Sequence, residues 1–181
     1  MTNLNSSKVG NHQLTDARIA AAIHAAIGTS PISIPRPALA VAVGGSIVGV
    51  LDLLYAIVVY SPRHPIIIPQ AIASGVLGEK AYRGGIVTAI LGIVLHFTIA
   101  FGAAITYYLA SRKLPFLIRH AVPFGLLYGA SVYFFMHLIV LPLSAGQFTP
   151  LSFTYTAGAE FVWHWFGFGL PIALSVRHYS Q

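Results

Sequence analysis

Hydrophobic residues gather in four long runs that are separated by short polar segments. The runs cover residues 38–60, 84–109, 121–143 and 157–176. A helix needs about 20 apolar residues to cross the roughly 30 Å hydrocarbon core of a bilayer, and each run meets that length. The pattern predicts an all-α fold, in which residues 38–181 form a single integral membrane domain, a four-helix bundle.

The segment between the first and second runs has a different pattern. Residues 65–78 are apolar but short, and they are interrupted by Pro65, Pro69 and Gly75. Such a stretch is too short to span a bilayer, and irregular backbone at membrane depth needs protein around it. We therefore predict a re-entrant or interfacial segment here.

The polar N-terminal tail, residues 1–37, contains one amphipathic stretch. Thr15 can cap a helix in which Ile19, Ile23 and Ile27 recur every four residues, and Gly28 can end it. The apolar part is short, rich in alanine and interrupted by a histidine. This favours a short interfacial helix on the membrane surface over a cleaved signal peptide.

Composition supports a membrane protein. Hydrophobic residues make up 56% of the 181 residues and charged residues only 8%, whereas soluble domains are about one quarter charged. The net charge of +6 comes from basic residues that flank the apolar runs and form no patch, so we expect no nucleic-acid partner. The absence of cysteine excludes disulfides, thiolate metal sites and iron–sulfur clusters.

The basic residues also predict the orientation. Three lie in the N-terminal tail, three between the second and third runs and one in the C-terminal tail, against three on the opposite side. Because Lys and Arg are enriched in cytoplasmic segments, both termini are predicted to be cytoplasmic. Aromatic residues near the run ends, Tyr55, Tyr60, Tyr107, Tyr108, Tyr133, Trp163 and Trp165, are predicted to form interfacial belts.

Each apolar run contains at least one ionisable side chain. These residues are Asp52, His96, His137, Glu160 and His164. Ionisable groups are costly in hydrocarbon and usually face the interior of a bundle, which makes them candidates for function. Their positions predict a polar cluster in the half of the bundle away from the cytoplasm, with His96 deeper than the rest. The alternative is that they make structural hydrogen bonds between helices.

Small residues predict where the helices approach one another. The candidate packing positions are Gly45, Gly49, Gly92, Gly125 and Gly129. Missing side chains allow membrane helices to come close enough for dispersion contacts. Asp52 shares a helix face with the first two of these glycines, which is consistent with a cluster inside the bundle.

The spacing Glu160-x-x-x-His164 places a carboxylate and an imidazole on one helix face. Helical metal sites and simple Glu–His salt bridges both use this spacing. Together with His137, these residues are candidate metal ligands, and a metal or haem is a candidate cofactor. No catalytic residue can be assigned, because the glycines form no phosphate-binding loop and no nucleophile elbow is present.

Several motifs in the second half of the chain resemble those of the YagU-type bacterial inner-membrane proteins. They are Phe135-x-His137-x-Ile139-x-x-Pro142-Leu143, Thr149-Pro150 and Glu160-x-x-x-His164, with His96, Tyr107 and Pro115 at similar spacing upstream. The resemblance implies a multi-pass protein of the bacterial inner membrane, and it marks His96, His137, Glu160 and His164. It implies no reaction, because none is established for that family.

Three functions remain open at this point. The leading hypothesis is a membrane protein that handles a proton, a metal ion or a small polar solute at the polar cluster. The second is a structural or accessory subunit of a membrane assembly. The third is a membrane-embedded metal or haem enzyme, although the sequence favours a protein that is not an enzyme. The expected partners are the lipid bilayer and either a second copy of the chain or another membrane subunit.

Overall fold

The computed structural model describes residues 18–19, 22–23, 35–146, 148 and 154–180. The chain divides into two units, Met1–Ile34 and Pro35–Gln181. In the first unit, Arg18, Ile19, Ala22 and Ile23 are helical. The rest of the predicted N-terminal helix lies outside the described residues.

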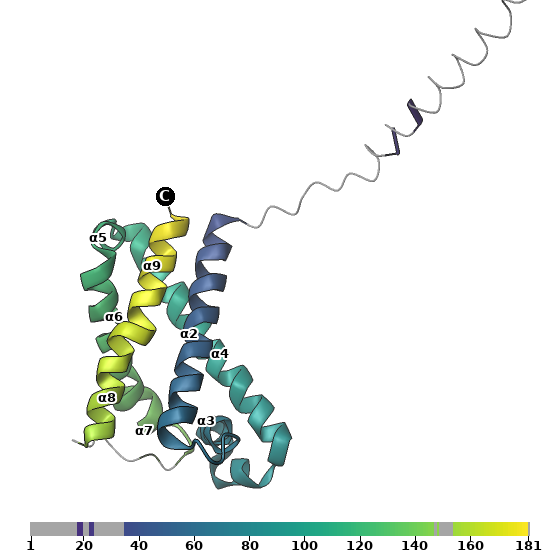
Figure 1. Ribbon diagram of the computed structural model, residues 1–181, viewed down its shortest axis with the longest axis vertical. Helices are drawn as coiled ribbons and strands as arrows, with labels where there is room; N and C mark the ends of the chain where they lie inside the picture. The colour runs from purple at the N-terminus through teal and green to yellow at the C-terminus, as the bar shows by residue number, and fades with distance from the viewer. Residues whose placement is uncertain (1–17, 20–21, 24–34, 147, 149–153, 181) are drawn as a thin grey trace, which may run out of the picture. The chain divides into compact units, whose positions relative to one another are not determined.

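The second unit is built from helices, and its described residues include no strand (Figure 1). The first part contains α2 (Arg36–Tyr60), α3 (Ile67–Leu77), the 3₁₀ helix η1 (Gly78–Arg83) and α4 (Gly85–Lys113). The second part contains α5 (Phe116–Arg119), α6 (Ala121–Phe135), the π-helix η2 (Met136–Val140) and α7 (Leu141–Leu143). The last part contains α8 (Tyr155–Trp163), the π-helix η3 (His164–Gly169) and α9 (Leu170–Tyr179).

Three helices of the described chain are long and apolar enough to cross a membrane. They are Arg36–Tyr60, Gly85–Lys113 and Ala121–Leu143, and they correspond to the first three predicted runs. This indicates a membrane protein. The fourth predicted run is also helical, from α8 through η3 to α9, but it is not among these three. Its interior is more polar, because it contains Glu160 and His164.

Each π-helix lies just before a proline. Pro142 follows the end of η2 by two residues, and Pro171 follows the end of η3 by two residues. Proline lacks an N–H group and its ring collides with the carbonyl four residues earlier, so the helix must deviate from regular α geometry at that point. π-helical turns are frequent at functional sites, and here they contain His137 and His164.

The segment predicted to be re-entrant or interfacial forms α3 and η1. The helix α3 packs against α4, where Gly92 has no side chain that would collide with the carbonyl oxygen of Pro69. The Gln70 side chain is buried and donates a hydrogen bond of 3.0 Å from Nε2 to the Gly85 carbonyl. The segment is therefore a short helix fixed to α4.

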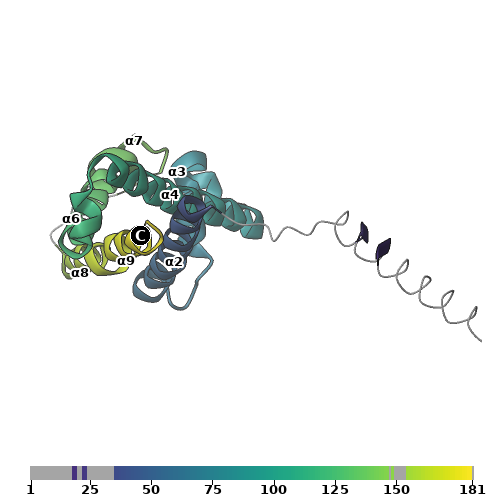
Figure 2. The same ribbon diagram turned by 90° about the horizontal axis from the view of Figure 1, so that it is seen from above.

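A core of small, aliphatic and aromatic residues joins α2, α4, α6 and α9, which surround the bundle axis in Figure 2. Its members include Ala40, Val48, Ala100, Ala104, Tyr107, Ala121, Phe168, Ile172, Ala173 and Val176. The predicted packing glycines contact neighbouring elements. Gly45 and Gly49 face the rings of Phe101 and Phe97 on α4. Gly125 and Gly129 face the backbone of η3 and α9.

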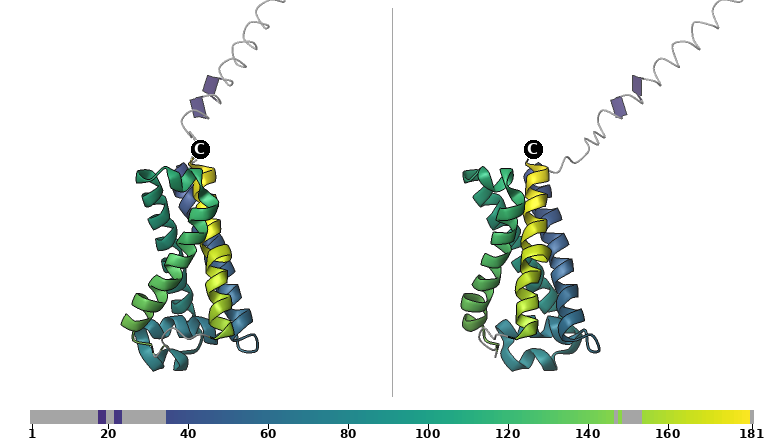
Figure 3. Two further views of the ribbon diagram at one scale, coloured as in Figure 1. Left: turned by 90° about the vertical axis from the view of Figure 1, so that its left-hand side faces the viewer. Right: turned by 60° about the vertical axis from the view of Figure 1, so that its left-hand side comes forward.

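The two ends of the bundle differ in the elements that they contain. The start of α2, the end of α4, α5 and the end of α9 lie at one end, whereas α3, α7 and the start of α8 lie at the other (Figures 1 and 3). The first end contains Arg36, Arg112, Lys113, Arg119 and Arg177. The second end contains Arg63, Lys80 and Arg83.

Candidate functional site

All five ionisable residues predicted from the sequence line one cavity of about 630 Å³, here called the polar cavity. They come from five elements: Asp52 from α2, His96 from α4, His137 from η2, Glu160 from α8 and His164 from η3. The cavity runs from His96 in the middle of α4 to residues at the helix ends, such as Tyr60 and Ser144. Most of its remaining wall is apolar.

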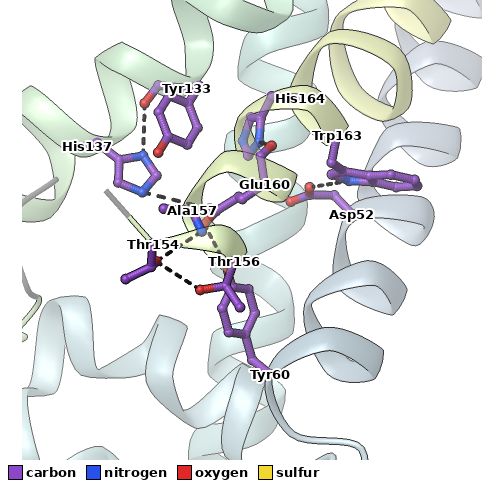
Figure 4. A network of polar contacts seen from close by, with 10 residues as sticks. All are labelled: Asp52, Tyr60, Tyr133, His137, Thr154, Thr156, Ala157, Glu160, Trp163 and His164. Atoms are coloured by element: carbon purple, nitrogen blue, oxygen red, sulfur yellow. Dashed lines mark hydrogen bonds and ion pairs between the residues drawn. The ribbon is translucent and has the colours of Figure 1, made fainter. Parts of the chain in front are cut away.

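Glu160 is the centre of a polar network (Figure 4). The Tyr60 hydroxyl donates a hydrogen bond of 2.6 Å to Glu160 Oε2, and His137 Nε2 lies 3.8 Å from Glu160 Oε1. Thr154 caps α8 by accepting a hydrogen bond of 3.3 Å from the Ala157 amide. The cap fixes the first turn of α8, and the network then connects this helix to α2 and η2.

Asp52 is hydrogen-bonded to a tryptophan. The indole Nε1 of Trp163 donates a hydrogen bond of 3.0 Å to Asp52 Oδ1. The Trp163 ring is in turn stacked on Tyr55, with centroids 4.5 Å apart and planes 6° apart. A neutral donor thus supports the carboxylate. Among the described residues, no hydrogen bond reaches Asp52 Oδ2.

Each histidine of the cavity has one ring nitrogen against a backbone carbonyl. His137 Nδ1 lies 3.0 Å from the Tyr133 oxygen and His164 Nδ1 lies 2.9 Å from the Glu160 oxygen. His96 Nε2 lies 2.9 Å from the Gly49 oxygen and thus ties α4 to α2. Because a carbonyl only accepts, these nitrogens must carry the hydrogen, and the second nitrogen of a neutral ring is then an acceptor.

His137 and Glu160 approach each other through one ring nitrogen and one carboxylate oxygen. A neutral His137 presents the unprotonated Nε2 to a carboxylate oxygen 3.8 Å away. Two acceptors do not attract each other, whereas a single proton on either group makes the contact favourable. At 3.8 Å the two atoms are too far apart for a direct hydrogen bond, so the contact is an ion pair only when the imidazole is protonated.

Aromatic rings fix the orientation of the two histidines on this wall. The ring of Tyr133 stacks on His137 with centroids 4.1 Å apart, and it meets His164 edge to face at 5.4 Å. The ring of Phe168 stacks on the other histidine, His164, at 5.5 Å. These contacts limit the rotation of the two imidazole rings.

The predicted metal ligands do not form a compact metal site. Within the described part of the chain, no three His, Asp or Glu side chains are grouped so that they could hold a metal ion. His137 and Glu160 approach each other, and His164, whose Nδ1 faces a backbone oxygen, offers only its Nε2 as a candidate ligand atom. These three residues share the polar cavity without converging on one point.

Sequence reasoning missed the roles of Tyr60 and Trp163. Both were assigned to interfacial belts, since both lie near the ends of apolar runs. In the structure, their polar atoms donate to Glu160 and Asp52. A signal was present, because Trp163 directly precedes His164 and is three residues from Glu160. This spacing places it beside the predicted cluster.

The chain matches no protein-family model, no curated protein and no solved structure. The resemblance to the YagU-type proteins therefore stays a prediction. Any functional conclusion has to come from the chemistry of the polar cavity.

Proposed function

We propose that this protein spans the bacterial inner membrane four times and binds a small organic cation in the polar cavity. The observation that supports this function best is the charge of the cavity wall. Asp52 and Glu160 both line it, and none of its described lining residues is Lys or Arg. The wall is therefore acidic when the histidines are neutral.

A cation would stabilise the two carboxylates. A carboxylate inside a membrane protein is costly unless it is paired or hydrogen-bonded. Each carboxylate has one neutral hydrogen-bond donor, from Trp163 or Tyr60, and no Lys or Arg of the described lining offers a counter-charge. A bound ammonium group would supply that charge and could reach the Asp52 oxygen that accepts no hydrogen bond.

The aromatic part of the wall favours an organic cation over a bare ion. Tyr55, Tyr60, Tyr133 and Phe148 line the cavity together with the carboxylates. Aromatic faces attract alkylammonium groups by about 0.5–2 kcal/mol each. The volume of about 630 Å³ falls within the usual range for small-molecule pockets, roughly 300–1,000 Å³. A proton or a metal ion would need far less space.

The proposed binding test uses tetramethylammonium and the protein in lipid nanodiscs. The chain has two tryptophans, and one of them donates to Asp52, so intrinsic fluorescence should report binding near this carboxylate. We expect Asp52→Asn and Glu160→Gln each to weaken tetramethylammonium binding at least tenfold. Glu79→Gln is the matched control, because Glu79 is exposed on η1 and is not among the lining residues.

Two outcomes of this test would contradict the proposal. Equal affinity in all four proteins would remove the carboxylates from binding. If Asp52→Asn and Glu160→Gln instead lowered the unfolding temperature without changing affinity, the cluster would be structural, as in a subunit of a larger assembly.

The proposed topology has its own support and test. The continuous helix from α8 to α9 serves as the fourth span, and the end of the bundle with more basic residues faces the cytoplasm, as both termini then do. Because the chain has no cysteine, single cysteines can be placed at two exposed positions, Ala145→Cys and His178→Cys. A membrane-impermeant maleimide added to intact cells should label only the first. Equal labelling of the two would refute four spans.

A further inference from the structure

A second cavity, of about 530 Å³, lies between α4 and the α6–η2 helix, and it is called here the α4–α6 groove. Its lining residues are Ile99, Gly102, Ala103, Thr106, Tyr128, Ser131, Val132, Phe135, Met136 and Val140. Three of these have hydroxyls, and each hydroxyl already donates to a backbone carbonyl within the protein. The groove therefore offers an occupant an apolar surface.

The groove and the polar cavity share part of their walls. Ile99, Val132, Met136 and Val140 line both spaces. The helix α4 packs mainly against α2 and α3, whereas α6 packs against η3 and α9. The two helices meet through Tyr128, which donates to the Ala103 carbonyl at 2.7 Å and contacts the Tyr107 ring at 5.0 Å. The residues that line both spaces form the boundary between them.

The side chains at this boundary can move. Met136 is unbranched and has three rotatable side-chain bonds, so it can adopt other rotamers at low cost. It lies in η2, one residue before His137. A displacement of Met136 would connect the apolar groove to the wall that holds the His137–Glu160 pair.

The groove faces the surface that would contact lipid. It lies between two of the three helices that are long and apolar enough to cross a membrane. Large apolar side chains on these helices are exposed near it, among them Ile105, Leu127 and Phe135. An occupant of the groove would therefore enter from the hydrocarbon region and not from water.

From this continuity we infer that the ligand is a cationic amphiphile that enters sideways from the bilayer between α4 and α6. Its charged head lies in the polar cavity near Asp52 and Glu160, and its alkyl chain lies in the α4–α6 groove. The inference rests on the proposed function, and it adds an apolar chain and a route of entry. A lipid with an anionic head is disfavoured, because two carboxylates line the polar cavity.

Two glycines allow a matched test. A Cβ atom at Gly102 or at Gly158 would meet no heavy atom within 4 Å, so Gly102→Leu and Gly158→Leu should both fold. Gly102 lines the groove, whereas Gly158 on α8 lines neither cavity. The leucine at position 102 would fill space that the alkyl chain needs. Equal unfolding temperatures of the two variants would show that the comparison is valid.

The probes are tetramethylammonium and decyltrimethylammonium, which share the charged head and differ in the chain. In nanodiscs, we expect Gly102→Leu to weaken decyltrimethylammonium binding at least tenfold and to leave tetramethylammonium binding unchanged. Gly158→Leu should change neither, which controls for partition of the longer probe into the bilayer.

The failures can be told apart. If tetramethylammonium binds through the carboxylates and Gly102→Leu leaves both affinities unchanged, the route of entry is wrong and the proposed function stands. If neither probe distinguishes the wild-type protein from Glu160→Gln, the proposed function fails, and the inference fails with it. A change of oligomeric state in Gly102→Leu without loss of decyltrimethylammonium binding would assign the groove to a second copy of the chain.

Discussion

The helix α6 takes part in two contacts that are built in opposite ways. On one side it meets η3 and α9 through Gly125 and Gly129, where the backbones themselves touch and Gly169 completes the contact. On the other side it faces α4 across a groove of about 530 Å³. The first contact allows no displacement without a collision. The second leaves room, and its walls are side chains that can change rotamer.

The comparison shows how a small membrane protein can be rigid and still contain a site. Helices in a bilayer gain little from hydrophobic burial, so close contact at small residues provides most of their association energy. The glycine contact supplies that energy on one side of α6. The other side can then tolerate cavities and polar groups, whose hydrogen bonds contribute only about 0.6 kcal/mol each on average.

The largest effect is expected from a substitution that breaks the glycine contact between α6 and η3. In Gly129→Leu, the new Cβ would collide with the carbonyl oxygen of His164, and backbone cannot move aside as a flexible side chain can. Overpacking typically costs about 1–3 kcal/mol and occasionally more, and a collision with backbone belongs at the upper end. We expect loss of folded protein, or a clearly lower unfolding temperature in detergent.

Ile139→Leu is the control for that variant, because Ile139 is exposed on the surface of η2 and the change conserves volume. It should unfold like the wild-type protein. If Gly129→Leu and Ile139→Leu were equally stable, the glycine contact would not be the rigid side of α6.

A smaller effect is expected within the polar cavity. Trp163→Phe keeps an aromatic ring that can stack on Tyr55 but removes the N–H that donates to Asp52. The loss should cost about 1–2 kcal/mol of unfolding free energy. A double-mutant cycle with Asp52→Ala isolates the interaction, since alanine has no side-chain acceptor for the indole N–H. Additive effects of the two changes would contradict the hydrogen bond.

The smallest effect concerns the outer edge of the network. Tyr60→Phe removes the hydroxyl that donates to Glu160, but Tyr60 is 46% exposed, so other donors can replace it. We expect a loss below about 1 kcal/mol in thermal unfolding. Tyr128→Phe is the matched control, because it removes a hydroxyl that is bonded to the backbone outside the polar cavity. A larger loss in Tyr60→Phe than in Trp163→Phe would reverse the predicted order.

Much of the fold follows from the distribution of apolar residues. The run 38–60 corresponds to Arg36–Tyr60 and the run 121–143 to Ala121–Leu143. The length of an apolar run predicts these helices because a helix must be apolar over the full thickness of the hydrocarbon that it crosses. The cost of ionisable groups in hydrocarbon also predicted that they would face one region. The structure places Asp52, His96, His137, Glu160 and His164 around one cavity, and a role for them in function remains a proposal.

The hydrogen-bond partners were beyond the reach of the sequence. An amphipathic ring near the end of an apolar run suits the membrane interface and a polar cavity equally well, so position in the run alone favoured interfacial belts for Tyr60 and Trp163. Only the spacing of Trp163 from Glu160 pointed to the cluster. Partner choice also depends on helix rotation. The sequence contains Pro142 and Pro171, but it does not show how the helix avoids the collision between each proline ring and the carbonyl four residues earlier. In the structure, a π-helical turn precedes each proline.

The π-helix η3 connects the polar part of the last helix with its core part. A π-turn holds one residue more than an α-turn over a similar rise, and one residue of an α-helix corresponds to a rotation of about 100°. The six residues of η3 thus set the angle between the face that presents His164 and the face that buries Ile172 and Val176. A deletion of one residue here would rotate the buried face of α9 by about 100° relative to α8. The number of residues in η3 therefore determines whether the cavity face of α8 and the core face of α9 are aligned.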